Sequence, residues 1–420
     1  MEIKLNEKYA VKVFAQENEG LGVTKIDNMV SFVENGLPGD EGEVEITELK
    51  KNYARGKMIS FTTLSGERQE APCPYFDECG GCDLQHQKYA YQLVFKEHKV
   101  KTALERIGGF KDVSINEIVF GEQFYYRNKI TLKVKGDKLG LYKHNTNDII
   151  DIESCLISNK KINEAIGVMR LFIKQYNENT FDSIVIRYSN KLMISVDGSD
   201  DLLETELVDF LPSKIENLQS LILNGKTIFG DDYIEEKIDD LTFKLSPKSF
   251  YQVNNSVMKK LYNKTIEYVS SIENNTILDL YCGIGTITSL LSSHADKVIG
   301  IEVVDAAIVN AEENLLTNNI ENVTFLKGKV GDAIKSLMEV TIDTVVIDPP
   351  RIGVEKWTLD SIIKISPKQI IYVSCNPVTL ARDLKILCSA GYKLVEVTPF
   401  DMFPQTSHVE CVVKIQKEDN

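Results

Sequence analysis

Residues 370–377, with the sequence IIYVSCNP, place a cysteine where an apolar strand gives way to a tight turn. The apolar residues 370–373 predict a buried strand, and Asn376-Pro377 cannot continue it. Ligands of an open parallel α/β sheet bind beyond the carboxyl ends of its strands, so Cys375 would face a crevice in such a sheet. A lone cysteine is otherwise explained as a small buried apolar side chain. The neighbouring segments therefore decide its role.

A strand, a glycine turn, a helix and a second strand follow one another from residue 277. Residues 277–281 are a short apolar strand, the turn CGIG at 282–285 opens a helix over 286–293, and the strand at 298–301 ends in Glu302. An acidic side chain there can accept both ribose hydroxyls of a nucleoside cofactor. The turn lacks the third glycine of the dinucleotide fingerprint, and no Walker lysine follows. This pattern favours a nucleoside without phosphates, S-adenosylmethionine above all.

Two further strand ends complete the predicted crevice. Residues 344–347 run into Asp348-Pro349-Pro350-Arg351, whose prolines stiffen the loop that carries Asp348. A final hairpin, formed by residues 393–397 and 409–415, encloses the loop at 400–408. A solvated turn accounts for Asp401 and His408 in that loop. It accounts less well for Glu410, whose apolar neighbours would partly desolvate it.

Five motifs in this order resemble one protein family, the S-adenosylmethionine-dependent RNA uracil-C5 methyltransferases, and within it the iron–sulfur 23S rRNA branch. The motifs are FYQVN at 250–254, DLYCGIGT at 279–286, DPPR at 348–351, SCNP at 374–377 and HVE at 408–410. The resemblance implies an α/β fold with a C-terminal Rossmann-like class I methyltransferase domain. It also implies roles for individual residues: Cys375 as nucleophile, Glu410 as general base, and Gln252, Tyr281, Glu302 and Asp348 as contacts of S-adenosylmethionine. Thr286 departs from the pattern, because relatives often carry asparagine there. Asp332 would either reach the adenine edge or lie in solvent.

The chemistry explains why such a site needs a thiol and a carboxylate. Uracil C5 is too electron-poor to attack a methyl sulfonium, but a thiolate that adds at C6 turns C5 into a nucleophile. After methyl transfer a base removes the C5 proton, so that the thiol can be eliminated. The thiol of an ordinary cysteine is mostly protonated at neutral pH, so nearby cations or donors would have to favour the thiolate of Cys375.

Length and composition bound the remaining organisation. The 420 residues, 43% of them apolar, predict two to four domains. Short alternating segments at 9–15, 29–33, 42–49 and 53–63 predict a small antiparallel barrel over residues 1–65, which resembles a TRAM domain. A central α+β domain is expected over 66–245, with a helix at 89–107 that packs on the catalytic domain in relatives and a strand pair at 184–188 and 192–196. The methyltransferase domain is expected over 246–420.

The first residues contain no apolar stretch typical of a signal peptide, and no run of eighteen apolar residues occurs. We therefore expect a cytoplasmic protein that does not bind membranes, a monomer without an implied protein partner. Its eight cysteines should then be thiols, metal ligands or catalysts rather than disulfides.

Three closely spaced cysteines, Cys73, Cys79 and Cys82, indicate a metal site. Their spacing and the glycines between them are hard to explain by packing alone. The resemblance supplies Cys155 as the fourth ligand and a [4Fe–4S] cluster as the group bound, whereas zinc held by four thiolates is the chemical alternative.

The net charge of −14 argues at face value against RNA, but its distribution does not. Residues 86–143 hold 12 Lys and Arg against 6 Asp and Glu, and residues 144–246 hold 10 against 19. The basic block includes YYRNK at 125–129, in which rings and cations suit bases and phosphates; a solvated basic face is the simpler explanation. By resemblance this segment lines the RNA-facing cleft.

The predicted function is methyl transfer to C5 of a specific uridine in RNA, most simply 23S rRNA. The target must be single-stranded or flipped out of its stack. The alternatives are a tRNA uracil-C5 methyltransferase, an RNA cytosine-C5 methyltransferase and a non-catalytic iron–sulfur RNA-binding protein. Cytosine-C5 enzymes usually carry a second cysteine at the DPPR position, which this chain lacks.

Overall fold

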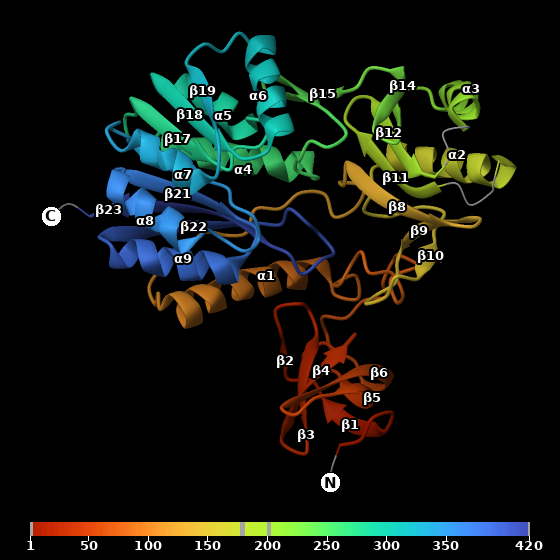
Figure 1. Ribbon diagram of the computed structural model, residues 1–420. Coiled ribbons are helices and arrows are strands. Elements are labelled where there is room, and N and C mark those ends of the chain that lie inside the picture. The colour runs from red at the N-terminus through yellow and green to blue at the C-terminus, as the bar shows by residue number, and fades with distance from the viewer. Residues whose placement is uncertain (1–2, 177–180, 200–202, 419–420) are drawn as a thin grey trace.

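An eight-stranded mixed sheet organises the carboxyl-terminal half of the chain. In the computed structural model, which describes residues 3–176, 181–199 and 203–418, the strand order of this sheet is β19-β18-β17-β20-β21-β23-β22-β7 (Figure 1). The first five strands in this order are parallel, and β23 runs antiparallel to both of its neighbours. The carboxyl ends of the five parallel strands therefore meet at one edge.

Strands alternate with helices along the chain from α4 to β22; β23 follows β22 directly, and β7 comes from much earlier in the chain. The strands are β7 (Ser114–Ile115), β17 (Thr276–Leu280), β18 (Lys297–Glu302), β19 (Val323–Lys327), β20 (Thr344–Ile347), β21 (Gln369–Ser374), β22 (Tyr392–Phe400) and β23 (Glu410–Lys417). The helices are α4 (Asn255–Val269), α5 (Thr286–Leu291), α6 (Asp305–Thr317), α7 (Val330–Ala333), α8 (Lys356–Ile365) and α9 (Pro377–Ser389).

Helices cover both faces of the sheet, because successive strand residues point to opposite sides and both sides are apolar. On β17, Ile277 packs in a cluster that includes Leu261 of α4, whereas Leu278 packs in a second cluster that includes Leu384 of α9. The sequence predicted β17, β18, β20 and β21, since a strand buried on both faces is a continuous apolar run, whereas β19 and β7 were not predicted.

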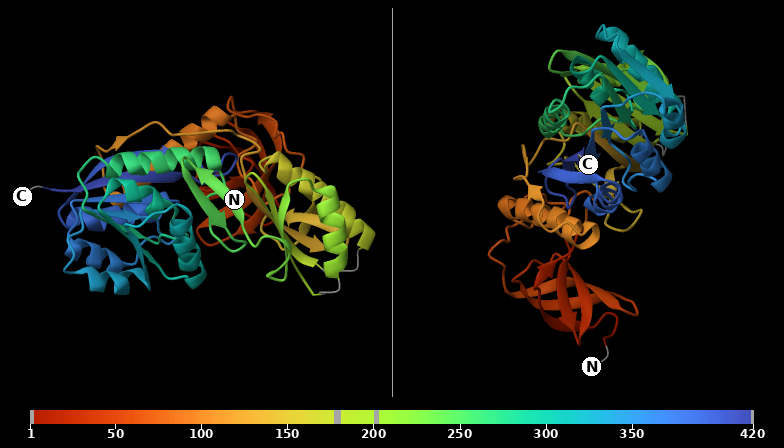
Figure 2. Two further views of the ribbon diagram at one scale, coloured as in Figure 1. Left: turned by 90° about the horizontal axis from the view of Figure 1, so that it is seen from above. Right: turned by 90° about the vertical axis from the view of Figure 1, so that its left-hand side faces the viewer.

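The apolar stripe predicted over residues 89–107 forms α1 (Tyr89–Ala103), which continues as a π-helical turn at Leu104–Gly108. Val100 and Leu104 join the same buried cluster as Leu384 of α9. Figures 1 and 2 show α1 lying along the eight-stranded sheet, between that sheet and the amino-terminal strands. The first helix of the chain is thus built into the core of the last domain.

The amino-terminal strands form a six-stranded sheet in the order β1-β5-β6-β4-β3-β2. The strands are β1 (Lys8–Lys12), β2 (Ala15–Gln16), β3 (Gly22–Ile26), β4 (Met29–Glu34), β5 (Glu41–Leu49) and β6 (Tyr53–Thr63). The expectation of a purely antiparallel arrangement was wrong for one pair, since β4 and β6 run parallel.

The predicted strand at 9–15 is also divided, and β3 was not predicted. The backbone N–H of Val13 donates to Asp40 O at 2.9 Å, and that of Phe14 donates to Val23 O at 3.0 Å. The chain therefore exchanges one partner strand for another at this point, a long-range event that local alternation does not encode.

A seven-stranded sheet in the order β10-β9-β8-β11-β12-β13-β14 forms the middle of the chain. Its elements are β8 (Lys129–Lys135), β9 (Lys138–Tyr142), β10 (Ile149–Asp151), α2 (Lys160–Tyr176), β11 (Phe181–Tyr188), β12 (Leu192–Gly198), α3 (Glu204–Lys214), β13 (Leu218–Leu223) and β14 (Lys226–Gly230). The predicted strand pair is present as β11 and β12, which are antiparallel. A separate hairpin of β15 (Ile234–Ile238) and β16 (Leu241–Leu245) leads into the last half.

The cysteine-bearing segment at 64–88 contains neither a helix nor a strand and is held by turns and by the middle sheet. The N–H of Gly80 donates to Tyr142 O at 3.0 Å, and that of His144 donates to Glu78 O at 2.9 Å. Among the residues that the structure describes, no helix has the length and apolar character needed to span a membrane.

Candidate active site

All six side chains predicted to act in catalysis or cofactor binding line one cavity of about 450 Å³ at the carboxyl edge of the parallel strands. They are Gln252, Tyr281, Glu302, Asp348, Cys375 and Glu410. Four of them end or directly follow β17, β18, β20 and β21, whose parallel direction brings these ends together. Glu410 arrives from β23, whose Cys411 pairs with Ser374, so the thiol of Cys375 and the carboxyl of Glu410 flank one strand pair.

The carboxylate of Glu302 closes the turn between β17 and α5. Its Oε2 accepts the N–H of Gly283 at 3.1 Å, and its Oε1 accepts those of Val303 and Val304 at 2.7 and 2.8 Å. A carboxylate has about four acceptor positions, so Oε2 keeps one for a ligand hydroxyl. Glu302 thereby shapes the pocket as well as facing into it, a second role that the sequence did not indicate.

The backbone of the glycine turn comes close to the cavity. Gly283 and Gly285 have φ of +55° and +74°, and a side chain on Gly285 would begin 2.8 Å from the ring of Phe325. Tyr281 also has a positive φ, +64°, an uncommon conformation for an aromatic residue. The left-handed conformation of the two glycines lets the backbone of the turn pass close to the cavity, which Gly283 lines.

Asp279, on β17, is a cavity residue that sequence reasoning missed. Its Oδ2 accepts a bond from the hydroxyl of Thr288 at 2.5 Å, whereas its Oδ1 is buried without a hydrogen-bond partner. Burial raises the pKa of Asp279 to about 7. The signal was its place on the strand, inside the DLYCGIGT motif, where an aspartate among apolar residues is unusual. An unpartnered oxygen in this wall suits the amino group of a nucleoside-linked amino acid, so the donor set fits S-adenosylmethionine.

Two buried carboxyls and one arginine set the electrostatics around Cys375. Burial raises the pKa of Glu410 to about 8, with Asp348 adding to the rise, and burial raises the pKa of Asp348 to about 7. Burial likewise raises the pKa of Cys375 to about 11, and Glu410 and Asp348 raise it further. The guanidinium of Arg351 opposes the rise at both Cys375 and Glu410.

His408 holds Arg351 at the mouth of the cavity. The Nη2 of Arg351 and the Nε2 of His408 are 3.1 Å apart. Burial and the neighbouring arginine lower the pKa of His408 to about 4, so the ring is neutral near pH 7 and can accept this bond. His408 is therefore part of the site and not a solvated turn residue.

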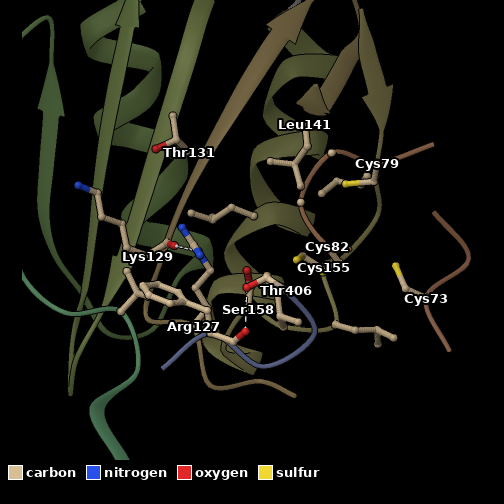
Figure 3. Close-up of a pocket in the computed structure, with 18 of the residues that line it drawn as sticks. Cys73, Cys79, Cys82, Arg127, Lys129, Thr131, Leu141, Cys155, Ser158 and Thr406 are labelled. Carbon is tan, nitrogen blue, oxygen red and sulfur yellow. Dashed lines mark hydrogen bonds between the residues drawn. The ribbon is translucent and has the colours of Figure 1, made fainter. Parts of the chain in front are cut away.

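A second cavity of about 590 Å³ adjoins the first, and Phe250, Tyr251, Arg351 and Phe403 line both. Figure 3 shows its two sides, with Cys73, Cys79, Cys82 and Cys155 on one and Arg127 and Lys129 on the other. Arg127, Lys129, Arg187 and Arg351 bring four cationic side chains to its lining. None of the four forms an ion pair with a carboxylate among the described residues. Burial, together with Arg187 and Arg127, lowers the pKa of Lys129 to about 8.

The segment YYRNK divides between two surfaces. Arg127 and Lys129 line the second cavity, whereas Tyr125 and Asn128 line a different hollow. Tyr126 is buried, and its hydroxyl donates to Pro404 O at 3.0 Å. That this segment lines the RNA-facing cleft remains a prediction.

The four cysteines share the second cavity as free thiols, with Cys79 and Cys82 buried. Burial raises the pKa of Cys79 to about 11 and also raises those of Cys73 and Cys82. Within the described part of the chain, no three His, Cys, Asp or Glu side chains lie in an arrangement ready to hold a metal ion. Four thiols in a common cavity fit a thiolate-bound metal. To bind it, the four sulfur atoms would have to move closer together.

Comparison with known proteins identifies the family. The sequence model of the tRNA (Uracil-5-)-methyltransferase family matches residues 88–418, and that of the TRAM domain matches residues 4–59. The chain belongs to the tRNA (uracil-5-)-methyltransferase family. It is an S-adenosylmethionine-dependent RNA uracil-C5 methyltransferase with a class I fold and an amino-terminal TRAM domain.

Relatives of this methyltransferase match along its whole length. An uncharacterized RNA methyltransferase of Bacillus cereus is 38% identical, over 95% of this chain and 94% of its own. Another from Clostridium tetani is 38% identical, over 98% and 96%. The crystal structure of Pyrococcus abyssi tRNA (uracil-54, C5)-methyltransferase in complex with S-adenosyl-L-homocysteine is similar with a TM-score of 0.76 and 28% identity, covering 96% of this chain and 99% of that one.

In this methyltransferase, Asp332 lies outside the cofactor-type cavity, and Asp401 is buried although a solvated position was expected. Asp332 is exposed and forms an ion pair with Lys335 at 2.9 Å, outside the cavity that holds Glu302. Asp401 was explained by a solvated turn, and this explanation was wrong. Its side chain is fully buried and bonds Lys96 and Tyr89 of α1, residues about three hundred positions earlier in the chain.

Proposed function

We propose that the protein methylates C5 of a uridine in RNA through a covalent adduct, with Cys375 as nucleophile and Glu410 as general base. The proposal rests on one observation above all, the convergence of the thiol and a buried carboxyl at the cavity that also holds the cofactor-type residues. S-adenosylmethionine supplies the methyl group when bound. We propose Gln252, Tyr281, Glu302 and Asp348 as its contacts, because the last three lie at the ends of β17, β18 and β20 and Gln252, just before α4, lines the same cavity.

The first step forms a bond between the sulfur of Cys375 and C6 of the uracil. The electron pair of the C5–C6 double bond moves toward O4, which leaves C5 able to accept the methyl group. Because the pKa of Cys375 is about 11, the thiol must lose its proton as it attacks, and the positive charge of Arg351 favours the thiolate.

The second step removes the C5 proton after methylation. Glu410 takes that proton, the C5–C6 double bond forms again, and the bond to Cys375 breaks to release the thiolate. A pKa of about 8 makes Glu410 a stronger base than an exposed carboxylate. A general base works best when its pKa lies near the pH at which the enzyme operates. The burial of Glu410 against Asp348 is the physical cause of that strength.

The second cavity supports a path for the RNA strand beside the target uridine. Its cations Arg127 and Lys129, which form no ion pair with a described carboxylate, suit backbone phosphates, and Phe250, 74% exposed between the two cavities, suits stacking on a base. The strand would enter along this cavity and present the flipped uracil to Cys375.

We propose 23S rRNA as the RNA and a [4Fe–4S] cluster on Cys73, Cys79, Cys82 and Cys155 as a second bound group. The cysteine spacing and the shared cavity support the cluster, which would supply structural support beside the RNA path. Protein purified without oxygen should be brown and contain iron, and a Cys82→Ser variant should lose most of it. Stoichiometric zinc without iron would reject the cluster.

A tRNA substrate is the second candidate, because the similar structure from Pyrococcus abyssi is a tRNA (uracil-54, C5)-methyltransferase. The two candidates are separated by incubating the purified protein and S-adenosylmethionine with unmodified 23S rRNA or tRNA transcripts. Mapping 5-methyluridine by mass spectrometry should find it in the rRNA at one or a few positions. Modification of tRNA alone would replace the proposal by the second candidate.

A further inference from the structure

The loop at 401–409, which joins β22 to β23, is held mainly by segments distant in sequence. Phe400 pairs with Glu410 at the point where the two strands open into the loop. Asp401 therefore leaves the sheet beside Glu410, the proposed base. His408, the partner of Arg351, lies two residues before Glu410 in the sequence. The course of this short loop decides where both side chains are held.

The first part of the loop is fixed by a buried ion pair with α1. Both Lys96 and Asp401 are fully buried, and the Nζ of Lys96 lies 2.5 Å from Asp401 Oδ1. The same Nζ donates to Phe403 O at 3.0 Å, and the hydroxyl of Tyr89 donates to Asp401 Oδ2 at 2.7 Å. Each oxygen of the carboxylate thus has its own partner on one helix.

The second part of the loop is fixed by two residues of α1, Gln92 and Lys99, and by Asp83, which precedes this helix. Gln92 and Gln405 bond each other through the side-chain amides, at 3.0 Å, and through the N–H of Gln405, at 3.2 Å. Asp83 accepts the N–H and the hydroxyl of Ser407 at 3.0 and 3.1 Å. Lys99 donates to Ser407 O at 2.8 Å.

Stability alone is a poor explanation of the Lys96–Asp401 pair. Removing two charges from water has a large cost, and well-packed apolar residues often replace a buried ion pair without loss of stability. The pair differs from apolar packing in one respect: it forms directional hydrogen bonds with the carbonyl of Phe403 and the hydroxyl of Tyr89. Such bonds fix direction, and the direction fixed here is that of the loop leading to Glu410.

We propose that Lys96 and Asp401 are positioning residues for the reaction, which hold the loop at 401–409 so that Glu410 can reach the C5 proton. This inference rests on the proposed covalent mechanism. It predicts that loss of the pair slows the proton-removal step more than the attack of Cys375, because Glu410 directly follows the loop at the start of β23, whereas Cys375 directly follows β21 and lies outside the loop.

The test compares Lys96→Met, the double variant Lys96→Met with Asp401→Asn, and Tyr89→Phe. In the full-length protein with an RNA that the wild type methylates, each should lower kcat, by tenfold or more for the first two and about threefold for Tyr89→Phe, with little change in kcat/KM, because the slowed step follows methyl transfer. The fraction of RNA–protein adduct surviving denaturing electrophoresis should rise during turnover. The double variant should regain the melting temperature that Lys96→Met loses, but not the turnover.

A matched control exists beside the amino-terminal sheet, where Arg68 of the segment 64–88 pairs with the buried carboxylate of Asp40, just before β5, at 2.5 Å. Arg68→Met should lower stability without raising the adduct fraction. Recovery of turnover together with stability in the double variant would overturn the inference, as would turnover without extra adduct in all three variants. If Lys96→Met does not fold, Tyr89→Phe, which removes only a hydroxyl, decides the result.

A parallel measurement on Glu410→Gln separates this inference from the mechanism beneath it. An adduct with Glu410→Gln but none above wild type in the Lys96 and Tyr89 variants rejects the positioning role alone. No adduct with Glu410→Gln rejects the covalent mechanism itself, and the inference with it.

Discussion

Replacing Glu410 with glutamine should remove a pH dependence of stability that the structure assigns to this one carboxyl. Burial raises its folded-state pKa from 4.5 to about 8. A raised pKa contributes stability that is fully present below the unfolded-state pKa and is lost as the pH rises through the folded-state value. Between about pH 6 and pH 9 the wild type should therefore lose roughly 2–3 kcal/mol of its free energy of unfolding because of Glu410.

Glutamine keeps the shape but has no proton to lose. Below about pH 4.5, where Glu410 is protonated in the folded and in the unfolded protein, the variant should match the wild type closely; above it the variant should be the more stable, and the gap should widen by roughly 2–3 kcal/mol between about pH 6 and pH 9. Asp348 and Asp279, whose pKa values are also raised, titrate in both proteins and largely cancel in the comparison.

The assay uses urea unfolding followed by the fluorescence of Trp357. This is the only tryptophan of the chain and lies on α8, so its signal reports the half that contains Glu410. Glu313→Gln, on the exposed side of α6, is the matched control and should show the wild-type pH dependence. Equal pH dependence in wild type and Glu410→Gln would refute the buried, proton-holding carboxyl and weaken its role as base.

Two further predictions concern the cofactor and the pH dependence of the rate. Glu302→Ala should weaken S-adenosylmethionine binding by about 1–3 kcal/mol in calorimetry, since it removes a charged acceptor and frees three backbone N–H groups; unchanged affinity would contradict the assignment of this pocket. The value of kcat/KM should rise from about pH 6 to pH 9, as Glu410 loses its proton and the thiolate of Cys375 becomes accessible. Arg351→Ala should move that rise to higher pH, because the arginine lowers the pKa of both groups; a profile that stays in place would show that Arg351 acts otherwise.

The strands of the catalytic sheet and the residues at their ends were predictable because both signals are local. Each buried parallel strand is a short apolar run, and the polar residue that follows it must lie at the common edge. This brought Cys375, Glu302 and Asp348 to one cavity from sequence alone. The proposed limits at 65/66 and 245/246 remain predictions.

The features that sequence missed depend on contacts between distant segments. Asp401 resembles a loop carboxylate until α1, some three hundred residues earlier, supplies Lys96 and Tyr89. The second role of Glu302 arises from three backbone N–H groups that only the folded turn brings together. Local patterns carry no information about such partners.

The most direct test of covalent catalysis uses an RNA that carries 5-fluorouridine at the methylated position. Fluorine cannot leave C5 as a cation, so the reaction should stop after methyl transfer with the RNA bonded to Cys375. Wild-type protein, S-adenosylmethionine and this RNA should give a complex that survives denaturing electrophoresis, and mass spectrometry should assign the linked peptide to Cys375. Cys375→Ala should give none while still binding RNA and cofactor. No complex with the wild type, beside normal turnover of unmodified RNA, would contradict the account, and a complex formed by Cys375→Ala would move the nucleophile to another cysteine.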